Sequence, residues 1–281
     1  MSVTRSRPVR PRHRWIWAIV ALVTAAFLIV PVALRFGLKA LLHHEYGPVR
    51  VYHRPVTSVQ VSAPGGTVAI TAGRPGQVSV DSTLAWVFSK PAVRESWHGT
   101  TLAVSVRCAA PLQGRGRKQG TRVRVAGCSA SLSLSVPADA EVRAAVGTGS
   151  ATVTGLAGAV RVTATSGSLV LAYLSGPLQA VATSGSITGM TGLNVPAVIA
   201  DVGSGSLALG LDSAPNSMSL AVGSGSGHVT VPPGTHYRVD AGPGKAVHVS
   251  PGLSSPRAAR LIAAKAGPGA LSIVYPGWLP G

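Results

Sequence analysis

Apolar and polar residues alternate with a period of two along much of the chain. The alternation is clearest in four stretches bounded by Gly and Pro, at residues 59–73, 77–88, 100–108 and 128–137. Such a pattern is typical of β-strands with one buried face. The sequence therefore predicts a series of strands, beginning near residue 57.

From residue 144 the alternation becomes a repeat. Its copies have small or apolar residues, a turn of Gly, Ser and Thr, and a second alternating run, and they occupy residues 144–153, 163–171, 180–189, 200–209 and 220–229. Their shared glycines, at spacings of 18, 18, 20 and 20 residues, are Gly149, Gly167, Gly185, Gly205 and Gly225. Weaker copies contain Gly244 and Gly269.

A period near 20 residues around a glycine turn predicts one coil of stacked strands per repeat. We therefore expect an all-β fold, a β-solenoid-like domain with successive coils of 18–20 residues over residues 142–250. Glycine serves where φ is positive or where backbones pack closely. The serines that follow these glycines would form a ladder along one edge, comprising Ser150, Ser168, Ser186, Ser206 and Ser226.

One segment near the C-terminus fits two kinds of structure. Residues 257–266 could form a short helix between Pro256 and Gly267, because proline favours a helix start and glycine a helix end. The register of the repeat instead makes the second half of this segment a strand. We prefer the strand.

The N-terminus has the features of a membrane anchor. Residues 15–34 are uncharged and mainly apolar, and as a helix these 20 residues would cross the hydrocarbon core. Five arginines precede them, and only Arg35 and Lys39 follow closely, so the positive-inside rule places the N-terminus in the cytoplasm. No small-residue cleavage site follows, which favours an uncleaved signal anchor.

These features divide the chain into four parts. We expect a basic cytoplasmic tail at 1–14, a transmembrane helix at 15–37, a membrane-proximal linker at 38–56 and an extracytoplasmic β-repeat domain at 57–281. Cys108 and Cys128 are the only two cysteines, and both lie in the exported part, where the compartment is oxidising. An even number of cysteines in such a compartment predicts a disulfide.

Positive charge gathers between the two cysteines. The chain has 25 basic and 8 acidic residues, a formal charge of +17. A glycine-rich stretch without acidic residues holds six of the basic ones, Arg107, Arg115, Arg117, Lys118, Arg122 and Arg124. Arginine binds phosphate through a planar fork of N–H groups, so this stretch is a candidate site for lipid headgroups or acidic wall polymers. Its location outside the membrane makes nucleic acid an unsuitable partner. The alternative is a solvated loop that keeps the protein soluble.

Sequence signatures of catalysis and of cofactor or metal binding are incomplete. The glycine runs lack the third glycine of a dinucleotide loop, and Gly244-Lys245 lacks the hydroxyl residue of a phosphate loop. The cysteines lack metal-ligand spacing, and the turns lack the aspartates of calcium-binding repeats. His228 and His248 lie one repeat apart and could stack, whereas Trp86, Trp97 and Trp278 suit packing. We expect no enzyme activity, no cofactor and no metal.

The cysteine-bounded strands, the segment SLSLSVPADAEVRA after Cys128 and the repeated [TS]-G-S turns together resemble the putative adhesin family of bacterial envelope proteins. The resemblance covers roughly residues 56–275. It implies a repetitive β fold and a role at the cell surface or envelope, and it supplies no catalytic residues. Adhesion, binding or scaffolding is the expected function. The alternatives are an accessory to an envelope enzyme and a stress-signalling membrane component that contacts another envelope protein.

Overall fold

A computed structural model describes residues 22–24, 43–87, 90–108, 128–242 and 246–277. The chain divides into two units, Met1–His43 and His44–Gly281. In the first unit, Leu22, Val23 and Thr24 are helical. Among the described residues, no helix has both the length and the apolar character to span a bilayer. Most of the expected anchor at 15–37 lies outside the described residues.

The second unit is all-β, as the sequence predicts. Its centre consists of long strands that run through a bend, and these are β3 (Ser58–Gly73), β8 (Glu141–Thr154), β9 (Val160–Leu174), β10 (Leu178–Leu193) and β11 (Ala197–Leu211). In each strand the buried positions alternate on both sides of the bend. The two halves therefore bury their apolar side chains in one shared core.

We call a bent strand, or a pair of shorter strands that takes its place, a coil. Coils stack in parallel and in register, so residues of one type form rows along the stack. One inward row contains the fully buried Leu102, Val59, Val142, Val160, Leu178, Val198, Met218 and Ile262. Burying each of these side chains contributes roughly 1.5–3 kcal/mol, so the core is built coil by coil.

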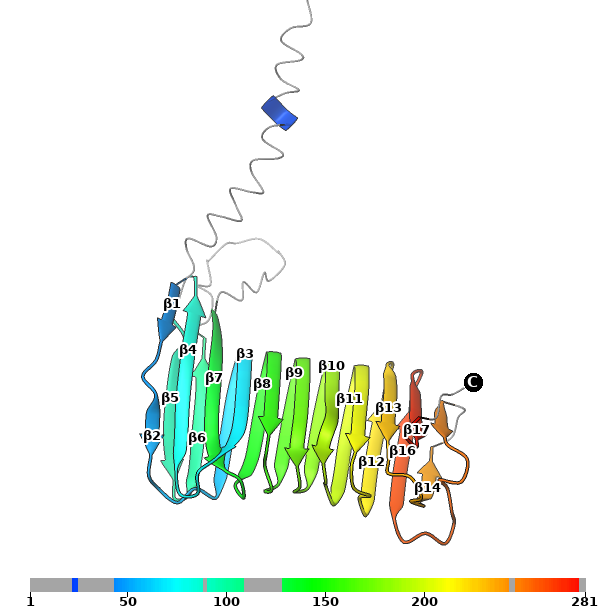
Figure 1. Ribbon diagram of the computed structural model, residues 1–281. Coiled ribbons are helices and arrows are strands. Elements are labelled where there is room, and N and C mark those ends of the chain that lie inside the picture. Colours follow the sequence, from blue (N-terminus) through cyan, green and yellow to red (C-terminus); the bar gives the residue numbers. More distant parts are fainter. Residues whose placement is uncertain (1–21, 25–42, 88–89, 109–127, 243–245, 278–281) are drawn as a thin grey trace, which may run out of the picture. The chain divides into compact units, whose positions relative to one another are not determined.

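The C-terminal coils do not stack in chain order. Three of them are split into strand pairs, β12 (Ser217–Val222) with β13 (Ser226–Thr230), β14 (Arg238–Ala241) with β15 (Val247–Val249), and β16 (Leu261–Ala266) with β17 (Ala270–Val274). The last pair lies between the other two, because β16 joins β12 to β14 and β17 joins β13 to β15 (Figure 1). Residues 142–250 are thus not all successive coils, and this part of our prediction was wrong. The segment at Leu261–Ala266 is a strand, as the repeat register indicated.

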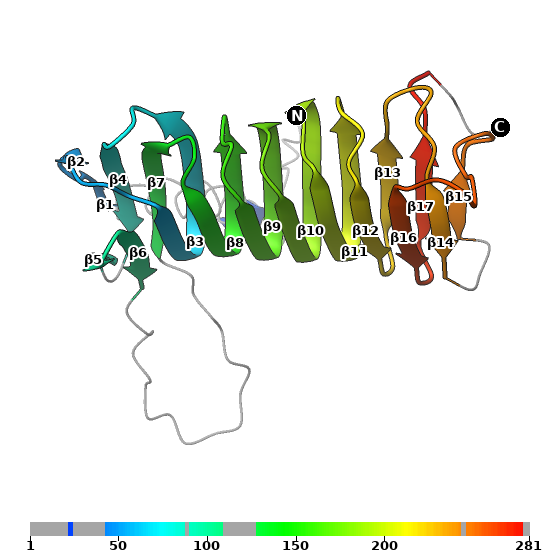
Figure 2. The same cartoon turned by 90° about the horizontal axis from the view of Figure 1, so that it is seen from below.

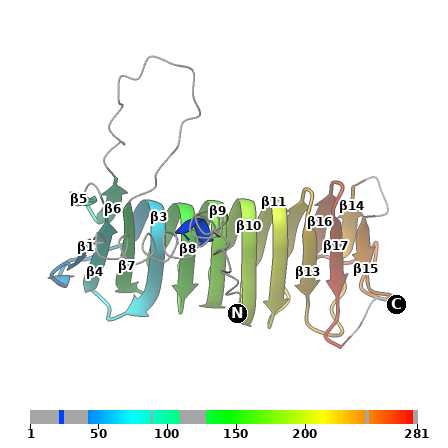
Figure 3. The same cartoon turned by 90° about the horizontal axis from the view of Figure 1, so that it is seen from above.

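The N-terminal end is interleaved in the same way. The coil formed by β6 (Thr101–Arg107) and β7 (Cys128–Pro137) lies outside β3, although β3 comes earlier in the chain (Figure 2). β8 occupies the other side of β3. Figure 3 shows the same order from above.

Antiparallel strands cover this N-terminal end of the stack. β5 (Ala92–His98) pairs with β6, and β4 (Val78–Trp86) pairs with β7. Two short strands, β1 (His43–Tyr46) and β2 (Arg50–Tyr52), then pair with β4. The linker expected at 38–56 therefore contains two strands within its described part.

Candidate functional site

The bends of the coils form one edge of the stack, which we call the corner edge. Gly149, Gly167, Gly185 and Gly205 lie opposite one another in successive coils, and Gly225 follows next to Gly205. Three of these glycines have φ values that favour glycine, 136° at Gly149, 151° at Gly185 and 141° at Gly205. Glycine is required here for conformation as well as for space.

Close packing of the corners excludes any side chain at these positions. A Cβ built on Gly167 would lie 1.8 Å from the carbonyl oxygen of Gly149, and the corresponding distance from Gly225 to the oxygen of Gly205 is also 1.8 Å. The row extends beyond the predicted glycines at one end, where Gly66 lies opposite Gly149, and at the other end the predicted Gly269 lies against Gly225. Gly66 escaped our prediction because its corner reads PGG and lacks the serine. Gly244 lies outside the described residues.

Hydroxyl groups follow the same edge. The serines after the glycines lie in register, and they comprise Ser150, Ser168, Ser186, Ser206 and Ser226. All of them except Ser150 line a shallow groove of about 800 Å³. A second row precedes the glycines, in which Ser204 donates a hydrogen bond to the hydroxyl of Ser184 at 3.2 Å. Ser150 likewise donates a hydrogen bond to the hydroxyl of Thr67 at 3.5 Å, so some hydroxyls of this edge link neighbouring coils and are part of the architecture.

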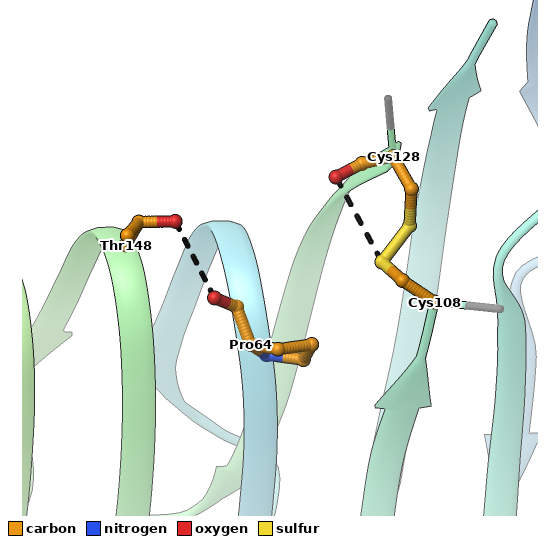
Figure 4. The surroundings of a disulfide bond; sticks show 4 residues. All are labelled: Pro64, Cys108, Cys128 and Thr148. Carbon is orange, nitrogen blue, oxygen red and sulfur yellow. Dashed lines mark hydrogen bonds between the residues drawn. A yellow bond between two sulfur atoms is a disulfide. The ribbon is translucent and has the colours of Figure 1, made fainter. Parts of the chain in front are cut away.

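The predicted disulfide is confirmed, and its position explains its role. Cys108 and Cys128, with Cα atoms 6.0 Å apart, close the corner of the β6–β7 coil, where neighbouring coils bend through glycine (Figure 4). The register places Ala130 opposite Gly66, just beyond the bond. The disulfide thus replaces a tight turn where residues 109–127 are inserted between the two halves of a coil.

Of the candidate anion-binding residues, the structure describes Arg107 alone. It ends β6 next to Cys108 and is exposed. The other five, Arg115, Arg117, Lys118, Arg122 and Arg124, lie outside the described residues. Arg107 lies two residues after Ser105 on the same strand, so both side chains lie on one face of the sheet.

The sheet face that carries Arg107 and Ser105 also carries a second group of basic residues, which we call the arginine hollow. Arg143 on β8 and Arg161 on β9 are direct partners in the register, and their side chains are 51% and 48% exposed. They flank a hollow of about 400 Å³ whose lining also includes Gln60, Ser62, Ala103, Ser105, Ala145 and Thr163. The hollow forms because small side chains on β3, β6 and β8 lie beside these two long ones.

One carboxylate serves both arginines. Oε1 of Glu141 accepts hydrogen bonds from Arg143 Nε at 3.0 Å and from Arg161 Nη1 at 2.9 Å. A guanidinium has five N–H donors, so one shared oxygen leaves donors for a ligand. Two cations opposed by one anion leave the cluster with a net charge of about +1, and like charges in direct register are unfavourable without a counter-ion. An anion bound in the hollow would remove this repulsion.

A spacing in the sequence could have revealed the pair. Arg143 and Arg161 are 18 residues apart, the same spacing as Gly149 and Gly167, so the repeat already places them side by side. The density of basic residues, which singles out residues 107–124, does not single out this pair. Arg94 on β5 adds a further cation, because it lies opposite Ser105 in the register.

The two histidines that we expected to stack do not lie in adjacent coils. His228 pairs with Ser272, and Ser272 pairs with His248, so β17 separates the two. The cause is that the last coil, β16 with β17, lies between the two coils that contain the histidines. Within the described part of the chain, no group of three or more His, Cys, Asp or Glu residues could hold a metal ion.

A third cluster covers the N-terminal end of the stack. The Tyr52 hydroxyl donates a hydrogen bond to Glu95, which also pairs with Arg50 at 3.5 Å. The hydrogen bond to Glu95 raises the pKa of Tyr52, with burial as a further cause. Trp97 packs edge-on against Tyr52 with ring centroids 5.2 Å apart, and Arg54 lies over the Trp97 ring at 5.0 Å. Each group has a partner within the cluster, so its contacts hold the terminal strands together.

Solved structures of similar proteins include a putative cell adhesion protein from Clostridium sporogenes, 12% identical, with a TM-score of 0.37 over 83% of this chain and 100% of that one. Putative adhesins from Bacteroides fragilis and Parabacteroides distasonis are each 12% identical, with TM-scores of 0.40, over 82% and 83% of this chain and 97% and 96% of theirs. These descriptions match the family that the sequence resembles. No protein-family model matches the chain, and no curated protein matches it.

Proposed function

We propose that this protein is a membrane-anchored envelope protein whose β-solenoid domain binds an anionic polymer or surface and catalyses no reaction. The arginine hollow carries the proposal. Its paired guanidinium groups share one carboxylate and are half exposed beside small side chains. Phosphate and carboxylate groups match the fork of N–H donors that arginine presents.

Arg107 extends this binding face. Arg107 lies on the same side of β6 as Ala103 and Ser105, which line the hollow. A long anion seated in the hollow could therefore extend along β6 toward Arg107 and the Cys108–Cys128 disulfide. This arrangement favours a polymer or a lipid surface over a small ion.

The proposed signal anchor at 15–37 would place the N-terminus inside the cell and the β domain outside it, because five arginines precede the apolar span. The expected topology is tested with protease, which should remove the C-terminal domain from intact cells.

The test of anion binding uses the full-length protein and two probes, poly(glycerol phosphate) and phosphatidylglycerol vesicles. The double variant Arg143→Gln with Arg161→Gln should weaken binding about 30-fold, since two exposed charge-assisted contacts contribute about 2 kcal/mol. The control, Arg257→Gln with Arg260→Gln, removes the same charge from exposed positions outside the hollow. Equal losses in both variants would show general attraction and refute a role for the hollow. Loss with one probe alone would identify the source of the anion.

A further inference from the structure

Tyr173 has a backbone conformation that is unusual for its residue type. Its φ is 54°, and it is the only non-glycine residue with a positive φ among those described. The register pairs Thr154 with Ala172 and Ala172 with Thr191, so the equivalent positions in the adjacent coils are Gly155 and Gly192. Those glycines have φ values of 79° and 67°. A tyrosine therefore occupies a turn position suited to glycine, and strained positions of this kind gather at functional sites.

The aromatic ring of Tyr173 is open to solvent. The residue is 59% exposed, and a Cβ built on Gly192 would lie 2.4 Å from its Cδ1 atom. The ring thus rests on the bare backbone of the next coil. Glycine at position 192 leaves room for this placement, while much of the ring remains available for contact.

Apolar and polar residues lie near Tyr173 on β9 and at the adjacent coils. Val170 and Met190 are exposed large apolar residues on the same two strands. The carboxylate of Asp212 accepts a hydrogen bond from the Gly192 amide at 2.9 Å. Threonines lie opposite the neighbouring residues of β9, and these are Thr152, Thr154, Thr188 and Thr191.

This surface is too small for a stable protein partner and suited to a sugar. A stable protein interface covers about 800 Å² on each partner and has a larger apolar centre than three side chains provide. A sugar ring has an apolar C–H face, which can stack on one tyrosine, and a rim of hydroxyls that need hydrogen-bond acceptors and donors. The Asp212 carboxylate makes a neutral sugar preferable to an acidic one.

We infer that Tyr173 is a stacking platform for a neutral glycan chain, with Asp212 and the threonines bonding to the sugar hydroxyls. The neighbouring strands extend this surface. Thr152 pairs with Ala69 and Thr154 pairs with Thr71, and these in turn pair with Ser133 and Ser135 on β7. One row of hydroxyls, formed by Thr154, Thr71 and Ser135, therefore continues across β8, β3 and β7 at the strand spacing of about 4.8 Å, where further sugar units could bind. Ala69 interrupts the other row.

The site is independent of the arginine hollow. It lies on the second halves of the coils, whereas Arg143 and Arg161 lie on the first halves. Variants of one site leave the other intact, so the two proposals can fail separately.

The test measures binding of the full-length protein in detergent to cellulose, to chitin and to peptidoglycan stripped of anionic polymers. Tyr173→Gly removes the ring but suits the backbone, so binding should weaken about tenfold or more while the melting temperature is not lowered. Tyr173→Phe should retain binding because the ring remains. Tyr46→Ala, which alters another exposed tyrosine on β1, should have no effect.

Asp212→Asn provides a second variant that keeps the ring in place. It should weaken binding to the same glycan, because a carboxylate accepts hydrogen bonds from hydroxyls more strongly than an amide does. Failure of the unaltered protein to bind any of the three glycans would overturn the inference. Binding by Tyr173→Gly equal to that of the unaltered protein would overturn it as well.

Discussion

The corner glycines provide a sharp test of how the stack is held together. We consider Gly167→Ala, where φ lies outside the left-handed region and space alone is the obstacle. The new Cβ would lie 1.8 Å from the carbonyl oxygen of Gly149, a backbone atom with no freedom to rotate away. The two corners would have to separate by more than an ångström, because such a contact needs at least about 3 Å.

That separation is large relative to the strand spacing of about 4.8 Å and breaks hydrogen bonds at the corner. Overpacking of a well-packed site costs about 1–3 kcal/mol, and each lost backbone hydrogen bond adds about 1 kcal/mol. We therefore expect Gly167→Ala to lower the free energy of unfolding by about 3 kcal/mol or more. Gly185→Ala should cost more still, because Gly185 has a φ of 151° as well as a Cβ distance of 1.9 Å.

Gly76→Ala is the matched control. Gly76 has a φ of 70° but no atom within 4 Å of a Cβ, so alanine there meets only the conformational cost of about 1 kcal/mol. Urea unfolding of the purified chain, followed by circular dichroism, gives all three values. If Gly167→Ala cost no more than Gly76→Ala, close packing of the corners would not be what selects glycine.

Three further predictions concern other parts of the molecule. Replacing Cys108 and Cys128 by Ala should lower the free energy of unfolding by roughly 3 kcal/mol, the chain-entropy value for a loop of this length, and urea unfolding with and without reductant measures it. Serine at Arg115, Arg117, Lys118 and Arg122 should reduce binding to anionic vesicles at low salt but not at about 1 M salt, where screening removes the attraction; equal binding at both would remove this segment from the binding face. Burial raises the pKa of Tyr237, so stability should be complete below pH of about 10 and fall above it as the unfolded chain loses the proton first. Tyr237→Phe should lessen that fall and preserve stability at pH 7, because the buried hydroxyl has no hydrogen-bond partner among the described residues.

The central coils could be predicted because the number of residues between repeated glycines equals the offset between partner residues in neighbouring strands. Gly149 and Gly167 are 18 residues apart, and the strands that contain them are direct neighbours, so counting residues gives the register. The same count finds Arg143 beside Arg161. Local alternation likewise identified the strands near residues 59–73 and 128–137.

Counting residues failed where neighbours in the stack are distant in the chain. β3 pairs with β7 and β8, whose partner residues come more than 60 positions later, and nothing in the alternation of apolar residues specifies which strand lies opposite. Alternation with a period of two also does not show that β4 and β5 run antiparallel to their partner strands. The φ of Tyr173 could not be foreseen either, because a tyrosine near the end of a strand suggests an ordinary extended residue.

The interleaved ends determine the order in which the molecule can be completed during synthesis. β14 and β15 leave the ribosome before β16 and β17, yet they have no place in the stack until that later pair has docked on β12 and β13. A chain stopped after residue 250 would expose the parallel edges of β12 and β13, which are open to pairing with other chains. At the N-terminal end, β3 likewise pairs only with strands that are made after it, namely β8 on one side and β6 and β7 on the other. The N-terminal end can close once β8 is made, whereas the C-terminal end closes only after β17 is made, so chains that stop before β17 should aggregate.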